Sequence, residues 1–185
     1  RIPIDPPYTG RAAGPMTRSV QDAALMMQVL SRPDARDSMG LPAQDIAWDQ
    51  VAASPEDLRG LRLGLLLDAG CGLPVDAEVR AAVEAAARLF EQTGAIVVPM
   101  APFLTRTMLD GMDHFWRMRS HMDLRTLTAE QQGKVLPFIR AWATSAAHLS
   151  GAEVFEASQQ FHATRVATVR ACMPFDYVLS PVAPI

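Results

Sequence analysis

The stretch LRLGLLLDAGCGLPVDAEVRAAVEAAARLFEQTGAIVV, residues 61–98, contains the pattern that decides the fold. Residues 61–67 form a short, nearly continuous apolar run, which is typical of a strand covered on both faces. Asp76 is placed to cap a helix that carries apolar residues at helical spacing until Gly94. Residues 95–98 form a second apolar run. A strand, a helix and a strand within about 40 residues predict a parallel β-α-β crossover.

On the amino-terminal side, the sequence predicts one helix followed by surface loops. Ser19 with Asp22 resembles a capping box, and the apolar residues that follow repeat at helical spacing. Apolar residues also lie on other faces, so this helix is expected to be buried on more than one side until Pro33 ends it. Residues 34–60 are expected to cross the surface, with Trp48 as an anchor.

The remaining segments predict a helical region and a closing strand. Residues 104–173 are expected to form three helices, with Pro137 either kinking the second helix or starting it. Residues 176–180 are expected to form a last short strand. Ile2 and Ile4 could form a short strand within an otherwise looped amino-terminal segment.

Composition excludes several classes of protein. A chain of 185 residues with 49% hydrophobic and 20% charged residues is typical of a folded globular protein. The net charge of −3 does not favour a nucleic-acid partner. No apolar run approaches the roughly 20 residues that span a membrane, so no membrane association is expected. Two cysteines, Cys71 and Cys172, make no disulfide framework, and a cytoplasmic location is expected.

Two local patterns suggest chemistry, and each has a simpler interpretation. The GCG turn at residues 70–72 follows a strand and precedes a helix, as in dinucleotide sites, but Val75 replaces the third glycine. We interpret it as a tight turn. The second pattern lies on the helix expected after residue 104: Asp110, Asp113, His114 and His121. A solvated acidic face is preferred to a metal site there, and no cofactor or metal is expected.

The most informative stretch is RIPIDPPYTGRAAGPMTRSVQDAALMMQVLSRPDARD, residues 1–37. It resembles the amidase signature family of serine amidohydrolases, in which a GRVP-like segment leads to a G-P-[ML]-x-R-[ST]-V-x-D-A-A helix and a P-D-x-R-D-like turn. The matching residues are Gly14, Pro15, Met16, Arg18, Ser19, Val20, Asp22, Ala23, Ala24, Pro33, Asp34, Arg36 and Asp37. FDYVLSPVAP, after Arg165, resembles the closing R…FDxLLTPTxP segment of the family, with Ser180 and Val182 where threonines often stand.

The resemblance implies an α/β fold: an α/β/α sandwich with a mixed sheet and outer helices. Residues 1–185 would form a single partial domain, with residues 104–173 as its mainly helical segment. It also implies hydrolysis of an amide to an acid and ammonia or an amine by a Ser–cisSer–Lys triad. In the family these residues precede the segment where this chain begins, and Lys134, the only lysine, does not match the lysine motif. We therefore expect no catalytic residue in this chain, which should be inactive alone.

The resemblance leaves a substrate-facing role for this chain. Trp116, Ser180 and Val182 are expected to line part of the pocket for a small-molecule amide. A homo-oligomer is also expected, because the first helix presents apolar residues that need a cover.

Two alternatives remain open. The whole protein could be the amidase-like subunit of a tRNA-dependent amidotransferase, which would act with partner proteins and tRNA. The stretch PYTGRAAGP, residues 7–15, favours a stand-alone amidase over this alternative. The chain could also be a non-catalytic binding or scaffold module of amidase ancestry.

Overall fold

The computed structural model describes residues 14–37, 40, 42–53 and 58–183. The expected strand at Ile2 and Ile4 lies outside the described residues. The chain divides into two compact units, Arg1–Asp57 (unit 1) and Leu58–Ile185 (unit 2), each described by itself. The expectation of a single domain over residues 1–185 is not tested by this division and stays a prediction.

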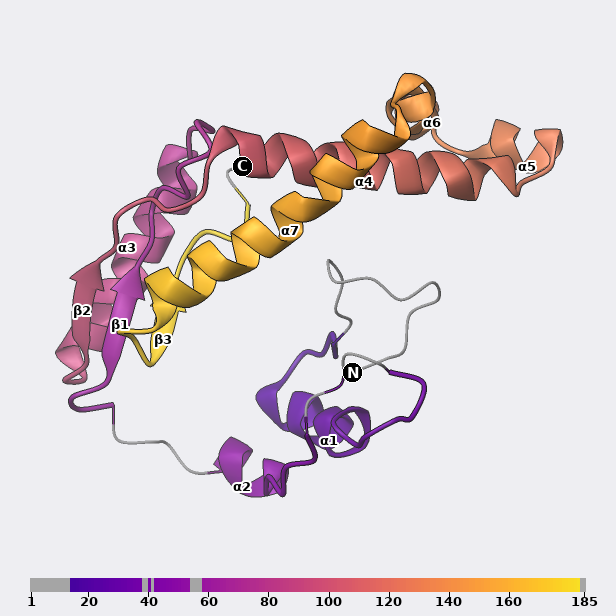
Figure 1. The fold of residues 1–185 in the computed structure, drawn as a ribbon. Helices are drawn as coiled ribbons and strands as arrows, with labels where there is room; N and C mark the ends of the chain where they lie inside the picture. Colours follow the sequence, from indigo (N-terminus) through magenta and orange to yellow (C-terminus); the bar gives the residue numbers. More distant parts are fainter. Residues whose placement is uncertain (1–13, 38–39, 41, 54–57, 184–185) are drawn as a thin grey trace. The chain divides into compact units, whose positions relative to one another are not determined.

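A small parallel sheet organises unit 2. Its strands are β1 (Arg62–Leu65), β2 (Ile96–Pro99) and β3 (Tyr177–Leu179), in the order β2-β1-β3 (Figure 1). Both strand pairs are parallel, with Leu63 opposite Val97 on one side and Tyr177 on the other. The predicted α/β class and the parallel β-α-β unit are thus confirmed. The described strands are all parallel, and the mixed sheet implied by the resemblance stays a prediction.

Helix α3 (Ala77–Gln92) connects the first two strands and packs against β2. The predicted cap is confirmed, because Asp76 Oδ1 accepts hydrogen bonds from the backbone N–H groups of Glu78 and Val79, at 2.8 and 3.4 Å. Such a cap satisfies amide donors that have no partner inside the helix. The aspartate therefore fixes where the helix begins after the loop that follows β1.

The helical region contains two long helices and two short ones. Helices α4 (Arg106–Arg125) and α7 (Gly151–Cys172) lie side by side, with α5 (Ala129–Lys134), α6 (Pro137–Thr144) and a 3-10 turn between them in the chain (Figure 1). Pro137 is the first residue of α6, so it starts a helix and kinks none. Proline suits that position because its missing N–H would have no helical partner there.

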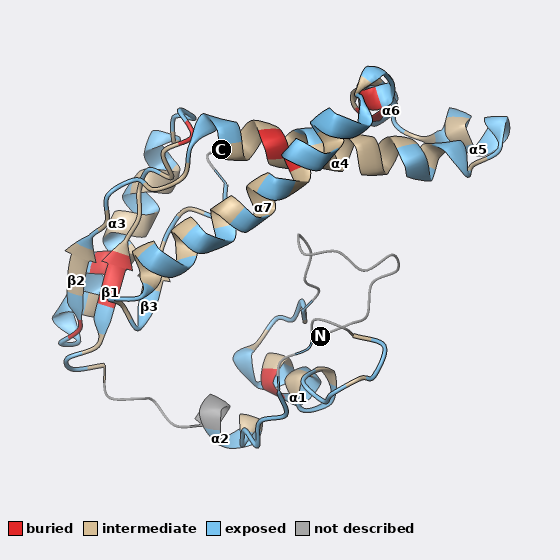
Figure 2. Ribbon diagram, viewed as in Figure 1, coloured by how far each residue is buried: buried red, intermediate tan, exposed pale blue. Residues whose placement is uncertain are grey.

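Small side chains form most of the core in the part of unit 2 that the structure describes. The buried apolar residues there are Leu63, Cys71, Ala87, Ala95, Ala143, Ala146 and Ala157 (Figure 2). Many larger apolar side chains are exposed, among them Phe155 and Met173 on or next to α7. Alanine buries little apolar area, so this core contributes modestly to stability.

Unit 1 contains helix α1 (Val20–Leu30) and the short helix α2 (Trp48–Ala53). The Ser19 hydroxyl oxygen accepts a hydrogen bond from the Asp22 N–H at 3.1 Å, as the capping pattern predicted. Trp48 anchors the loop as expected, because its Nε1–H donates to the Ser31 hydroxyl oxygen at 3.1 Å. The α2 helix itself was not predicted, because six residues show no clear period.

The expectation that α1 is buried on more than one side is wrong for this chain. Its buried residue is Ala24, while Val20, Leu25 and Val29 are more than 60% exposed. Apolar spacing shows which faces could be covered, but α2 is too short to cover more than one of them. The expected homo-oligomer stays a prediction.

The turn after α1 contains a tight ion pair. Asp34 Oδ1 accepts hydrogen bonds from the backbone N–H and the Nε–H of Arg36, both at 2.9 Å, and Oδ2 accepts one from the guanidinium at 2.7 Å. The side-chain bonds, followed by the backbone bond, lower the pKa of Asp34 from its ordinary 3.8 to about 2. This interaction favours the folded turn above pH 3.8, and the benefit is lost as the pH falls through about 2.

Replacing Arg36 with alanine should raise the pKa of Asp34 most of the way back toward 3.8, since only the backbone bond would remain. Titration of the Asp34 carboxyl carbon by NMR measures this. Arg32→Ala is the control, because the Arg32 guanidinium donates to the Gln28 carbonyl oxygen instead. An unchanged pKa in Arg36→Ala would show that the ion pair does not hold this turn in solution.

Candidate functional site

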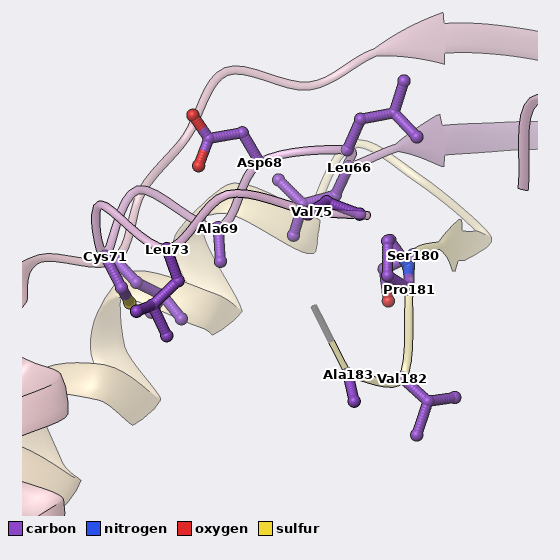
Figure 3. Close-up of a pocket in the computed structure, with 12 residues that line it drawn as sticks. Leu66, Asp68, Ala69, Cys71, Leu73, Val75, Ser180, Pro181, Val182 and Ala183 are labelled. Atoms are coloured by element: carbon purple, nitrogen blue, oxygen red, sulfur yellow. The ribbon is translucent and has the colours of Figure 1, made fainter. Parts of the chain in front are cut away.

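A pocket lies in unit 2 where β1 and β3 end. It has a volume of about 290 Å³ (Figure 3). Its lining consists of Leu66, Leu67, Asp68, Ala69, Cys71, Leu73, Val75, Leu104, Ser180, Pro181, Val182 and Ala183. The carboxyl edge of a parallel sheet is the usual place for a ligand in α/β folds, because loops from neighbouring strands meet there.

Backbone hydrogen bonds hold the loop after β1 in place. The Leu66 N–H donates to the Leu179 carbonyl oxygen at 2.9 Å, which joins the start of this loop to β3. The Leu104 N–H donates to the Ala69 carbonyl oxygen, also at 2.9 Å. Asp68 Oδ1 accepts from the Gly70 N–H at 2.8 Å and closes the turn. The loop after β1, which forms this wall of the pocket, is therefore held by the end of β3 and by the segment before α4.

The GCG turn is a tight strand-to-helix turn, as the sequence predicted. Gly70 and Gly72 both have positive φ, at 96° and 74°. At Gly70 there is also no room for a side chain, because a Cβ atom would collide with the Leu104 carbonyl oxygen. The positive φ and the close approach of Leu104 together explain why glycine stands at position 70.

Cys71 is the one buried residue of the pocket lining, with 8% of its surface exposed. Burial raises the pKa of its thiol above the ordinary value, and the nearby Asp68 carboxylate raises it further. Arg106 acts in the opposite direction, but its guanidinium is paired with Asp110 at 2.7 Å. The thiol is therefore protonated at neutral pH and is a weak nucleophile.

The lining is suited to binding rather than to catalysis. The polar groups on it are the carboxylate of Asp68, the thiol of Cys71 and the hydroxyl of Ser180. Activation of a hydroxyl or thiol needs an adjacent base. Within the lining that the structure describes, the Asp68 carboxylate accepts the Gly70 N–H at 2.8 Å, and neither a histidine nor a lysine is present to serve as a base.

The structure brings two of the three predicted site residues together. Ser180 and Val182 both line the pocket, directly after β3. Trp116 lies on α4, where its ring meets the edge of Phe115 at a centroid distance of 6.5 Å, and it is not in the pocket lining. The substrate-binding roles of all three residues stay predictions.

The loop after β1 belongs to the candidate site, although no motif in the sequence marks it. Residues 70–72 were predicted as a turn only, yet Cys71 and Leu73 line the pocket. One general signal was present, because ligands collect at the carboxyl ends of parallel strands, and two such strands had been predicted.

The acidic residues of α4 have structural partners. Asp113 accepts hydrogen bonds from Arg117 Nε at 2.6 Å and from Trp142 Nε1 at 3.0 Å, which joins α4 to α6. The same Arg117 donates to the Ser145 hydroxyl oxygen at 2.9 Å. Among the described residues, no group of three or more histidine, cysteine or acidic side chains could hold a metal ion.

Lys134 lies on α5, where its ammonium group pairs with Glu130 at 2.7 Å. Both side chains are more than 70% exposed, so this pair is a solvent-facing helix contact. In the parts of the chain that the structure describes, no helix is both long and apolar enough to cross a membrane.

A parallel α/β unit with an apolar pocket at the carboxyl edge of its sheet defines a general class of ligand-binding enzyme folds. The model of the Amidase family matches residues 7–185, so the chain belongs to the Amidase family. This confirms the resemblance to amidase signature proteins that residues 1–37 and the closing segment showed.

Named relatives include subunits of glutamyl-tRNA(Gln) amidotransferase from two bacteria. The one from Solidesulfovibrio magneticus is 41% identical over 88 residues, and the one from Myxococcus xanthus is 42% identical over 90 residues. Each match covers 48% of this chain and 18% of the relative. The chain thus matches less than a fifth of the length of these curated relatives.

Solved structures show the same fold. A bacterial aryl acylamidase of the amidase signature family superposes with a TM-score of 0.73 at 24% identity, over 90% of this chain and 35% of that one. The 6-aminohexanoate cyclic dimer hydrolase superposes with a TM-score of 0.69 at 20% identity, over 85% of this chain and 34% of that one. At these identities the likeness concerns the fold alone.

Proposed function

We propose that the protein to which this chain belongs is an amidase that hydrolyses a carboxylic acid amide to an acid and ammonia or an amine. The observation that carries the proposal is membership of the Amidase family over residues 7–185. The proposed nucleophile is a serine outside this chain, deprotonated through a second serine by a lysine, with backbone amides stabilising the oxyanion. This chain would contribute part of the substrate pocket.

The pocket at the sheet edge supports that division of roles. Its wall is mostly aliphatic, and the described lining places no histidine or lysine beside the Ser180 hydroxyl or the protonated Cys71 thiol. Such a wall can position a substrate next to a nucleophile supplied from elsewhere. In this proposal Ser180 and Val182 contact the substrate, and Trp116, which lies outside the pocket lining, contributes from α4.

A second candidate is the amidase-like subunit of a tRNA-dependent amidotransferase. The observation that favours it is the name shared by the relatives at 41% and 42% identity. The whole protein would then act with partner proteins and an aminoacylated tRNA. Amidation of glutamyl-tRNA(Gln) by the whole protein with its co-purifying partners would favour this candidate over a stand-alone amidase.

The residues 1–185 expressed alone should hydrolyse no amide and form no adduct with a fluorophosphonate probe, because the proposed serine and lysine lie elsewhere. The whole protein should be labelled on one serine and should hydrolyse amides. Mass spectrometry of the labelled peptides and an ammonia-release assay measure both. A stoichiometric serine adduct on the short chain would contradict the proposal, and an unlabelled, inactive whole protein would favour a non-catalytic module.

A further inference from the structure

We infer that the pocket at the sheet edge selects the uncharged, apolar acyl or aryl part of the amide substrate. The inference rests on the proposed function and adds the class of substrate. The loop after β1 supplies one wall, and the segment that follows β3 supplies the other (Figure 3). Three observations support the inference. The lining is rich in carbon, the Asp68 carboxylate is directed away from Ser180 and Ala183, and the described lining residues include no cation.

Hydrocarbon dominates the lining. Nine of the twelve residues have purely aliphatic side chains: Leu66, Leu67, Ala69, Leu73, Val75, Leu104, Pro181, Val182 and Ala183. Buried apolar surface attracts a ligand roughly in proportion to the apolar area that leaves water. The volume of about 290 Å³ lies near the lower end of small-molecule sites, and it suits a phenyl ring or a short alkyl chain.

The polar groups of the lining do not create a charged subsite. The Asp68 carboxylate already accepts the Gly70 N–H at 2.8 Å. Figure 3 shows this carboxylate directed away from Ser180 and Ala183. The buried Cys71 thiol is neutral at physiological pH, because burial and Asp68 raise its pKa. Asp68 is therefore the only charged residue of the lining that the structure describes, and its carboxylate is directed away from the segment that follows β3.

A charged substrate would find no counter-ion in this pocket. A carboxylate group on the substrate would need a lysine or arginine, and the described lining residues include neither. An ammonium group would need a carboxylate that faces the ligand, and the Asp68 carboxylate is directed away from Ser180 and Ala183 and already accepts the Gly70 N–H. Because a charge that leaves water without a partner is strongly disfavoured, the pocket excludes both kinds of group.

Two amides of similar length test the selection in the whole protein: hexanamide, which ends in a methyl group, and glutaramate, which ends in a carboxylate. The kcat/KM for hexanamide should be at least about tenfold higher than that for glutaramate. Each additional methylene that the pocket buries raises kcat/KM roughly fourfold. Leu73→Asp should reduce the preference for hexanamide by at least about tenfold, because it replaces an apolar side chain of the lining with a charged one. Leu89→Asp, on the outer face of α3, should leave it unchanged, since Leu89 is 63% exposed and lies outside the pocket.

A second readout does not depend on catalysis. Methyl methanethiosulfonate modifies thiols, and peptide mapping follows Cys71 and Cys172 separately in the whole protein. Hexanamide at four times its Kd should slow modification of Cys71 about fivefold, as expected from 1 + [L]/Kd. Cys172 lies on α7 outside the pocket and should not be protected.

The two readouts separate the two proposals. Protection of Cys71 by hexanamide but not by glutaramate, in a protein that hydrolyses neither, would support the inference and overturn the amidase proposal. Amide hydrolysis with a preference for glutaramate, or without protection of Cys71, would overturn the inference and leave the amidase proposal standing. An equal effect of Leu73→Asp and Leu89→Asp on the preference would also overturn it.

Discussion

Replacing Gly70 with alanine is expected to lower the free energy of unfolding by about 3 kcal/mol, one of the largest effects of a single methyl group in this chain. Two costs add at this position. The φ of 96° is unfavourable for a residue with a side chain. The new Cβ atom would also collide with the Leu104 carbonyl oxygen, a backbone atom that cannot rotate away.

Gly72 provides the matched control in the same turn. Its φ of 74° is also positive, but a Cβ atom there would have no neighbour within 4 Å. Gly72→Ala should therefore carry only the conformational cost, about 1 kcal/mol. Urea denaturation followed by circular dichroism measures both variants. Equal losses in the two would show that the loop does not approach Leu104 closely in solution.

Gly70→Ala should also alter the pocket. Relief of the collision requires the loop after β1 to move away from the segment before α4, and both Ala69 and Leu104 line the cavity. In the whole protein, the variant should lose protection of Cys71 by hexanamide, whereas Gly72→Ala should retain it. This outcome would connect the shape of the turn to ligand binding.

The strand–helix–strand unit could be predicted because its signals are local. The apolar run of β1, the cap at Asp76 and the glycine that follows α3 each lie within a few residues of the boundary that they set. Pro137 was recognised as a boundary for the same reason, although the sequence did not decide between a kink and a start. The α2 helix was missed because six residues hold too little periodicity to predict one.

The candidate site was harder to predict because it is formed by residues distant in the chain. Ser180 and Cys71 line one pocket at the sheet edge only because β1 and β3 are neighbours in the sheet. Spacing along the sequence does not reveal that neighbourhood. Ser180 and Val182 came from a family pattern, whereas Cys71 and Leu73 had no motif to mark them.

Trp116 and helix α1 show a further limit of the sequence. An apolar residue on a helix is compatible with a pocket wall, a core or an interface, and the pattern alone does not distinguish them. Trp116 packs beside Phe115 on α4, and α1 exposes Leu25 and Val29. The tertiary structure decides which surface covers an apolar face of a helix. The helical period of the sequence does not contain that information.

Replacing Gly111 with leucine should separate the two long helices of unit 2 and lower the free energy of unfolding by about 2 to 3 kcal/mol. Gly111 is the buried residue of α4. A Cβ atom there would overlap Gln160 on α7, approach its Cβ atom to 2.8 Å, and lie 3.4 Å from the Ala157 carbonyl oxygen. The gain in helix propensity, about 1 kcal/mol on leaving glycine, is too small to offset this overlap.

A substitution at Gly133 on α5 is the control that separates the effect of helix propensity from the effect of packing. A Cβ atom at Gly133 would have no neighbour within 4 Å, so Gly133→Ala should gain stability by up to about 1 kcal/mol. The two variants should therefore change the urea midpoint in opposite directions. If Gly111→Leu were as stable as the parent chain, α4 and α7 could not pack through Gly111 and Gln160 as the structure has them.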